Sequence, residues 1–367
     1  MERIKATLLG DGKSITLETF SASVAGQPVR ASARLPLPAD VTRLSADELR
    51  AWMIAHAEAQ LQLKDAELAA VAPFAQAWIA PTGKLNVDLK LDPGLEWEGS
   101  LTVTDAATRP LGPLGVLQSI QADLAVSGRT LRVNRVEAKA GGQPVTLSGS
   151  AEYHKTEGWI LDLALKGNQL PFLRQTGFLV RGDVDLKVKT ESPTLTRVTG
   201  KALLRDSLFL ADIRNFIPRG SVRTAPSRRP PYFSVEALPF ARWQLGVEVE
   251  GNRFLRLRTP VFAGLASARF RLQGTLAEPV AIGEAIVHEG QVLFPFASLQ
   301  VQQGAVSLTE LDPFEPRISL VAVSRRLGYD LRMELSGTAS DPNLTFTSSP
   351  PLDSEQVLRL VMAGEAP

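Results

Sequence analysis

Few residues of this 367-residue chain have the types and spacing that catalysis requires. The three histidines, His56, His154 and His288, lie far apart, and the pair His288-Glu289 lacks the second histidine of a zinc-binding helix. The sequence contains no Gly-x-Ser-x-Gly segment, which would place a nucleophilic serine on a sharp turn. We therefore predict no catalytic, cofactor-binding or metal site, and we expect that the protein is not an enzyme.

One short motif resembles part of a phosphate-binding loop but lacks its context. Residues 12–14 have the sequence Gly-Lys-Ser. A phosphate-binding loop also needs a glycine five residues before Gly12, where this chain has Thr7, and a helix after the loop. Residues 15–17 instead alternate like a strand, so we expect no nucleotide there.

The composition excludes several classes of protein. The formal net charge is +1, so no strong field favours nucleic acid, and no cysteine is present to form disulfides or thiolate metal sites. The most apolar stretch, residues 66–80, is interrupted by Glu67, Pro73 and Gln76 and is too short to span a bilayer. The first residues lack the apolar core of an export signal, so we expect no export signal within these residues.

Strict alternation of apolar and polar side chains is the main structural signal. From residue 329 it places Tyr329, Leu331, Met333 and Leu335 on one face and Asp330, Arg332, Glu334 and Ser336 on the other. Residues 85–91 and 183–188 alternate in the same way. A period of two is typical of strands with one dry and one wet face. The acids at 183 and 185 therefore belong to an ordinary solvated surface.

These strands predict an all-β protein with a long curved antiparallel sheet. At roughly a dozen residues per strand and turn, the chain holds about twenty strands, and a spacing of about 4.8 Å gives a sheet on the order of 100 Å long. Residues 15–33 also resemble a later segment, because both contain Gly-Gln-Pro-Val, at 26–29 and 142–145. Such repetition favours an open solenoid, or β-taco, that forms an elongated groove.

Two helices are predicted beside this sheet. The first spans residues 46–71, where Ser45 and Glu48 can form a capping box and Pro73 ends the pattern. Its apolar stripe consists of Leu49, Trp52, Met53, His56 and Leu63. We expect it to cover an end or edge of the sheet, since its acidic opposite face disfavours a membrane surface. A short C-terminal helix begins after Asp353, with Gln356 as its capping partner.

Residues 218–231 interrupt the strand pattern and suggest a division of the chain. This stretch is rich in arginine and proline, which predicts an exposed loop, either a solvated insertion or a contact for anionic lipid. We accordingly expect a repetitive β-groove segment over residues 1–217, including the helix at 46–71, and a second β domain over 232–367.

The second of these domains resembles a known family. From Gly283 to Pro295 the sequence follows G-x-x-x-V-x-x-G-x-V-x-F-P. Then come Gly304-x-Val306, a strand ending in Gly337, Pro342-x-Leu344, Ser349-Pro350-x-Leu352 and a short helix ending at Gly364. This order over about 80 residues is similar to the C-terminal domain of the TamB family, within the AsmA-like group. The family continues beyond this helix, so the resemblance implies a truncated domain.

The resemblance implies a function in the bacterial cell envelope. Members are inner-membrane-anchored proteins that extend through the periplasm, and they are thought to carry phospholipid between the inner and outer membranes. The resemblance therefore implies either a fragment of a longer anchored protein, which we favour, or a relative that has lost the anchor. They are also linked to outer-membrane protein and autotransporter assembly and secretion with a TamA-like barrel. The expected partners are therefore phospholipid acyl chains, that barrel and the inner membrane, through an anchor that this chain lacks, with no nucleic acid and no cofactor.

An apolar groove explains how such transport could work. Moving a sixteen-carbon chain into water costs on the order of 12 kcal/mol, and a lining of aliphatic side chains removes most of that cost. We predict that the lining includes Leu186, Val188, Phe270, Leu272, Leu331, Met333, Leu335, Leu344 and Phe346. Two alternatives stay open: a closed structural β-rod or passenger-type stalk whose own side chains fill the interior, and an envelope enzyme on a β-helix.

Overall fold

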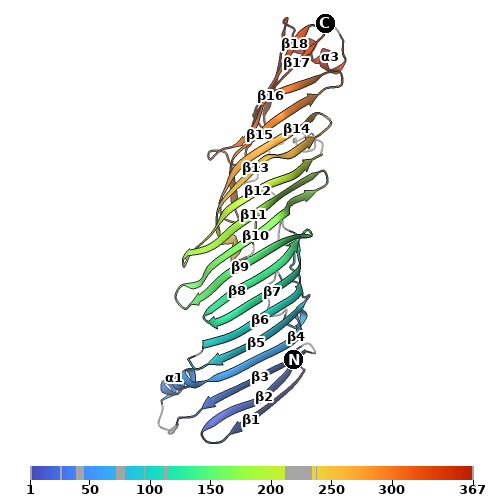
Figure 1. Ribbon diagram of the computed structural model, residues 1–367. Coiled ribbons are helices and arrows are strands. Elements are labelled where there is room, and N and C mark those ends of the chain that lie inside the picture. Colours follow the sequence, from blue (N-terminus) through green and yellow to red (C-terminus); the bar gives the residue numbers. More distant parts are fainter. Residues whose placement is uncertain are drawn as a thin grey trace. The chain divides into compact units, whose positions relative to one another are not determined.

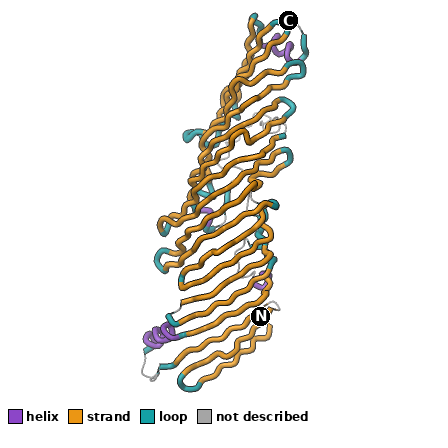
Figure 2. The backbone as a smooth tube through the Cα atoms, in the orientation of Figure 1, coloured by secondary structure: helices purple, strands orange, loops and turns teal. Residues whose placement is uncertain are grey.

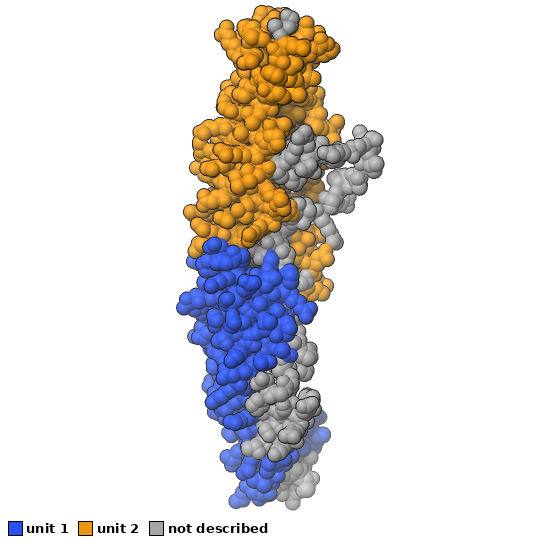
Figure 3. Space-filling model, turned by 90° about the vertical axis from the view of Figure 1, so that its right-hand side faces the viewer, with its two compact units in different colours: residues 1–167, 187–196 blue, residues 168–186, 197–367 orange. Residues whose placement is uncertain are grey.

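The computed structural model describes residues 2–24, 27–38, 45–71, 79–94, 96–110, 115–210, 234–236 and 238–365. Its nineteen strands form one largely antiparallel open sheet, accompanied by short helices (Figures 1 and 2). This confirms the predicted all-β class and the long antiparallel sheet. The chain divides into two compact units, residues 1–167 with 187–196 and residues 168–186 with 197–367 (Figure 3).

The first unit contains strands that pair in sequence order, each antiparallel to the next. They are β1 (Glu2–Gly10), β2 (Ser14–Val24), β3 (Gln27–Pro36), β4 (Glu58–Glu67), β5 (Lys84–Asp92), β6 (Glu96–Ala106), β7 (Leu117–Gly128), β8 (Thr130–Ala140) and β9 (Gln143–His154). The last of them pairs with β10 (Gly158–Gln175), which, like β11 (Phe178–Ser192) and β12 (Leu195–Phe209), contributes residues to both units. Every pairing from β1–β2 to β9–β10 is antiparallel.

The second unit continues with antiparallel hairpins after one parallel pairing. Its strands are β13 (Gln244–Arg258), β14 (Phe262–Gly274), β15 (Pro279–Leu293), β16 (Ser298–Leu308), β17 (Arg317–Arg326), β18 (Tyr329–Thr338) and β19 (Pro342–Ser349). Strand β12 pairs parallel with β13, which the alternation alone could not predict. Parallel neighbours need a long connection, and residues 210–243 lie between these two strands in sequence. A 3-10 turn, η5 (Phe240–Arg242), belongs to that segment, whereas the predicted loop at 218–231 lies outside the described residues.

The first predicted helix is confirmed at its start and corrected at its end. Helix α1 (Ala46–His56) begins after Ser45, and its capping box with Glu48 is present. It ends at His56, and the indole N–H of Trp52 donates to the Pro36 carbonyl oxygen at 3.0 Å. Residues 58–67 instead form β4, because Ala59, Leu61 and Leu63 alternate with polar side chains and strands flank this segment on both sides. A short helix, α2 (Leu68–Val71), follows.

The capping box of α1 makes its stability depend on pH. The Glu48 carboxylate accepts the Ser45 backbone N–H at 2.8 Å, and this hydrogen bond, with a second from the Ser45 hydroxyl, lowers the pKa of Glu48. A carboxyl with a lowered folded pKa stabilises the fold above its ordinary pKa, and this contribution is lost as pH falls through the lowered value. We therefore expect Glu48→Gln to speed hydrogen exchange of the first α1 amides at neutral pH. The difference from the unaltered protein should vanish once the pH lies below the lowered pKa, and a difference that persists there would contradict this account.

The C-terminal helix is confirmed as predicted and closes a hydrophobic core. Helix α3 (Ser354–Met362) begins after Asp353, whose carboxylate accepts the Gln356 backbone N–H at 2.7 Å. The core beneath α3 consists of Leu299, Ala322, Leu331, Met333, Val357, Leu360 and Val361, all 4 % exposed or less. Because its members come from β16, β17, β18 and α3, this core fixes the helix to the end of the sheet.

Candidate functional site: an apolar sheet face

One face of the first unit carries an unbroken row of apolar side chains. Directly opposed residues of neighbouring strands share a face of the sheet. By this register the row is Leu63, Val87, Leu101, Leu124, Val133, Gly149 and Leu163, running from β4 to β10. We call the face that bears this row the inner face. The other face carries charged and polar residues such as Asp88, Lys90 and Asp123.

The inner face of the first unit is mostly half-buried. In the row, only Val87 and Val133 are less than a tenth exposed, while the four leucines are intermediate. An apolar face packed fully by its own protein would leave its leucines buried, as in the core beneath α3. The row therefore has the exposure of a lining that an apolar ligand can reach.

The second unit repeats this arrangement on its own strands. Val249, Phe270, Gly283 and Leu308 are registered across β13 to β16, and Leu320, Leu335 and Leu344 across β17 to β19. We use the term inner face for this side of the second unit as well. The opposite, outer face carries a cross-strand ladder of opposite charges, in which Lys201 lies 3.3 Å from Glu248. Opposite charges on neighbouring strands stabilise the pairing.

The predicted lining residues fall into groups with different surroundings. Phe270, Leu272 and Leu335 are half-buried on the inner face, and Leu344 is 51 % exposed. In β11, Leu186 is half-buried and Val188 is buried. Their role in binding lipid stays a prediction.

The remaining three predicted lining residues lie at the core formed with α3. Leu331 is 2 % exposed and Met333 is 4 % exposed, and both belong to this core, while Phe346 packs against it. Packing against Val357 and Leu360 therefore accounts for the burial of Leu331 and Met333 without a ligand. The alternation identified their face correctly, but the sequence did not indicate that α3 covers that part of it.

The strand alternation did not predict the structural role of four glycines on the inner face. Gly99, Gly149, Gly200 and Gly283 lie in β6, β9, β12 and β15, that is, in every third strand. Each has φ between +131° and +145°, which side chains other than glycine rarely adopt. A Cβ atom at any of them would lie 2.0–2.1 Å from a carbonyl oxygen of the neighbouring strand. These positions therefore bring two backbones together where no side chain fits.

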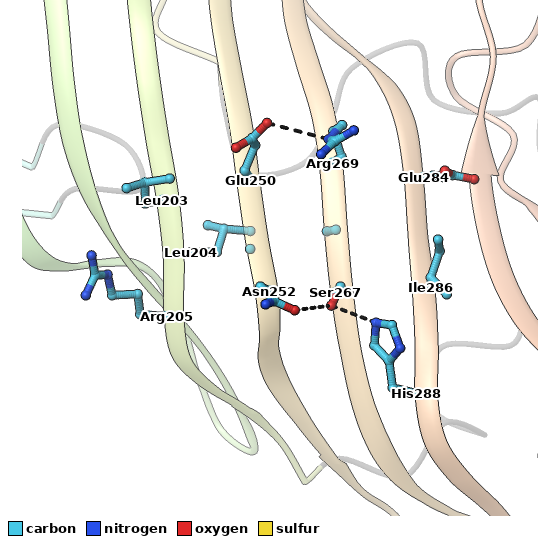
Figure 4. A pocket seen from close by; sticks show the side chains of 12 residues that line it. Leu203, Leu204, Arg205, Glu250, Asn252, Ser267, Arg269, Glu284, Ile286 and His288 are labelled. Carbon is cyan, nitrogen blue, oxygen red and sulfur yellow. Dashed lines mark hydrogen bonds and ion pairs between the residues drawn. The ribbon is translucent and has the colours of Figure 1, made fainter.

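The outer face of the second unit has an open pocket of about 730 Å³ (Figure 4). Its polar residues come from neighbouring strands: Arg205 from β12, Glu250 and Asn252 from β13, Ser267 and Arg269 from β14, and Glu284 and His288 from β15. The Arg269 guanidinium lies 3.5 Å from Glu250, and the Ser267 hydroxyl is within hydrogen-bond distance of both Asn252, at 3.3 Å, and His288 Nε2, at 2.8 Å.

A serine beside a histidine raises the question of nucleophilic catalysis. In a catalytic triad a third group orients the histidine through its other ring nitrogen. Here Asn252 bonds to the serine instead, and the Ser267 oxygen also accepts the Arg253 backbone N–H at 2.7 Å. Arg253 has φ +46° at a bulge in β13, so Ser267 satisfies the displaced backbone there. The contacts of Ser267 with Asn252 and His288 are therefore explained by stabilisation of the β13 bulge, without a catalytic role.

Neither metal ligation nor membrane spanning finds support in the described part of the chain. Within those residues no group of three histidine, cysteine, aspartate or glutamate side chains could hold a metal ion. Likewise, α1 has only 11 residues, and no other helix in the described ranges has the length and hydropathy of a membrane span.

Comparison with known proteins identifies a family that matches part of the chain, including the inner face of the second unit. The family model for the TamB C-terminal domain matches residues 134–366, more than half of the chain. The match begins in β8 and ends after α3. A search of curated proteins found no match.

Proposed function

The chain belongs to the TamB C-terminal domain family, and from this premise we propose that its inner face carries phospholipid between the inner and outer membranes. TamB proteins are cell-envelope proteins of transport and assembly rather than enzymes. In this proposal the acyl chains lie along the apolar rows and the head group stays in water. The protein would act in the periplasm as part of an inner-membrane-anchored protein.

The half-buried inner face is the single observation that carries this proposal. Leucine, valine and phenylalanine side chains on most of the registered strands supply an apolar surface for acyl chains. Burying a methylene against such a surface is worth about 0.8 kcal/mol, so a chain of ordinary length is held without any head-group site. A closed structural rod, the main alternative, would need the same leucines to be buried by the protein's own side chains.

A TamA-like outer-membrane barrel is the protein partner that we propose. Family membership implies a partner of this kind in general terms. Supply of phospholipid at the outer membrane would support insertion of outer-membrane proteins and autotransporters by that barrel. Lipid transport and assembly are then two consequences of one apolar path.

Inserting a charge into the inner face tests the proposal. Phe270 is half-buried on the inner face of β14, so Phe270→Glu places a carboxylate where an acyl chain would lie. Because a charge in an apolar path is costly, we expect native mass spectrometry to find several-fold less co-purified phospholipid. Met333 is a poorer choice, because its burial beneath α3 would make the same change disrupt a packed core.

The matched control lies three residues further along the same strand. Gln273→Glu adds the same charge to the outer face of β14 and should leave lipid occupancy unchanged. Circular dichroism should report the same strand content for both variants. Equal lipid occupancy in Phe270→Glu and the unaltered protein would contradict an acyl path along this face.

A further inference from the structure

Most of the exposed large apolar side chains that the structure describes in the first unit lie along one rim of its sheet. Because neighbouring strands are antiparallel, β1, β3, β5, β7 and β9 all end at the same rim, where β2, β4, β6, β8 and β10 begin. The exposed large apolar residues at this rim are Leu8, Leu9, Ile15, Met53, Ile54, Trp97, Tyr153 and Trp159. In the described part of this unit only Val116 is exposed at the opposite rim.

Three of these residues are aromatic and lie at the ends of inner-face rows. Trp97 is two residues before Gly99 in β6 and is registered with Leu91, so it shares the inner face. Tyr153 and Trp159 are registered with each other in β9 and β10, and their rings meet edge to face at 5.3 Å. Trp159 is 53 % exposed, Tyr153 45 % and Trp97 37 %. Each of these rings therefore lies where the inner-face side chains of its own strand reach the solvent-exposed rim.

Charged residues begin directly beyond these rings. The turn between β9 and β10 contains the exposed Lys155 and Glu157, and on the outer face of β9 the Glu152 carboxylate lies 2.9 Å from His154 Nε2. Within the described residues, neither Tyr153 nor Trp159 makes a side-chain hydrogen bond to the protein, so their polar atoms are available. Along β9 and β10 the surface thus changes from aliphatic to amphipathic aromatic to charged over a few residues.

The order of these surfaces, from aliphatic through aromatic to charged, matches the order of groups in an amphiphilic molecule. Tyrosine and tryptophan place an apolar ring beside a polar O–H or N–H, and they favour the boundary between hydrocarbon and polar head groups. A phospholipid presents the same order of acyl chain, ester-linked glycerol and charged head group. The mixed charges beyond the rings suit a zwitterionic head group better than an anionic one.

We propose that Trp97, Tyr153 and Trp159 form a lip along this rim that binds the glycerol and ester regions of phospholipids whose acyl chains lie on the inner face of the first unit. The lip rests on the proposed lipid function and adds to it the place where the molecule crosses from groove to water. Head groups leave the groove through this rim and not through the rim that carries Val116. The hydroxyl of Tyr153 and the indole N–H groups donate hydrogen bonds to ester oxygens.

Fluorescence quenching by brominated phosphatidylcholine tests this placement. The chain has five tryptophans, so the signal of Trp159 is taken as the difference between the unaltered protein and Trp159→Phe. We expect this difference signal to be quenched more by lipid brominated near the glycerol end of its acyl chains than by lipid brominated near the methyl end. Stronger quenching by the methyl-end label, or none by either label in lipid-loaded protein, overturns the lip. Unchanged emission is also the outcome expected if another protein covers this rim.

Transfer kinetics supply the second measurement. We expect the double variant Tyr153→Ser, Trp159→Ser to take up fluorescent phosphatidylcholine from vesicles about two- to tenfold more slowly than the unaltered protein. The matched control, Val116→Ser, removes an exposed apolar side chain of the opposite rim and should keep the original rate. Equal slowing in both contradicts the lip. If the unaltered protein takes up no lipid at all, the proposed function itself fails. If the unaltered protein and the double variant take up lipid at the same rate, only the lip is contradicted.

Discussion

Gly149→Ala is expected to lower the free energy of unfolding of the first unit by roughly 2–5 kcal/mol. Gly149 has φ +133°, and an added Cβ would lie 2.1 Å from the Asp162 carbonyl oxygen and 2.9 Å from the Leu163 Cα atom. Both contacts are with backbone atoms of β10, which cannot move aside without breaking the β9–β10 ladder. Urea unfolding followed by tryptophan fluorescence should show the midpoint at a clearly lower concentration.

Gly158→Ala provides the control for this change. Gly158 also has a positive φ, +76°, but an added Cβ would meet nothing within 4 Å. It therefore carries the backbone strain without the collision, at a cost of about 1–2 kcal/mol. If both variants unfold at the same urea concentration, then the close approach of β9 and β10 at Gly149 is not what restricts this position.

The glycines also show what strand alternation could not predict. Alternation assigned residues 85–91 and 329–336 to strands with the correct dry face, because a period of two depends only on the local order of side chains. The positions of Gly149 and Gly283 in every third strand depend on which backbone lies opposite, and that follows only from pairing. In the sequence, the recurrence of glycine on the dry face was the one available signal of these close backbone approaches.

The extent of α1 illustrates a second limit. Its start was predictable because Ser45 and Glu48 form a capping box within four residues. Its end was not, because residues 58–67 carry both a helical stripe and an alternating pattern. Pairing with β3 and β5 satisfies the backbone of this segment on both sides and decides in favour of the strand. The parallel pairing of β12 with β13 likewise has no local signal.

The candidate site was predicted in part for the same reason. The face on which Phe270 and Leu335 lie followed from their alternation. The aromatic rim was not predicted, because Trp97, Tyr153 and Trp159 are separated in sequence and only the common direction of the turns brings them to one rim. The cover over Leu331 and Met333 depends on where α3 packs, which its amphipathic pattern does not specify.

The second large effect is expected from Leu360→Ala in α3. The Leu360 side chain is fully buried against the core that contains Leu331 and Met333, and removing three of its carbons leaves a cavity. Leucine-to-alanine changes at such sites typically cost about 2–5 kcal/mol. Two residues away on the same helix, Leu358 is 45 % exposed, so Leu358→Ala should cost less than about 0.5 kcal/mol. Thermal unfolding of the two variants gives the comparison.

The same pair of variants tests whether α3 covers part of the apolar inner face. When α3 detaches, Leu331 and Met333 join the half-buried inner face, because they lie on the same side of β18 as Leu335. Leu360→Ala should therefore increase binding of an apolar fluorescent dye at temperatures below unfolding, whereas Leu358→Ala should not. Equal dye binding in both variants would mean that α3 stays in place without Leu360. In that case the apolar face ends at this core, and Leu331 and Met333 act only in packing.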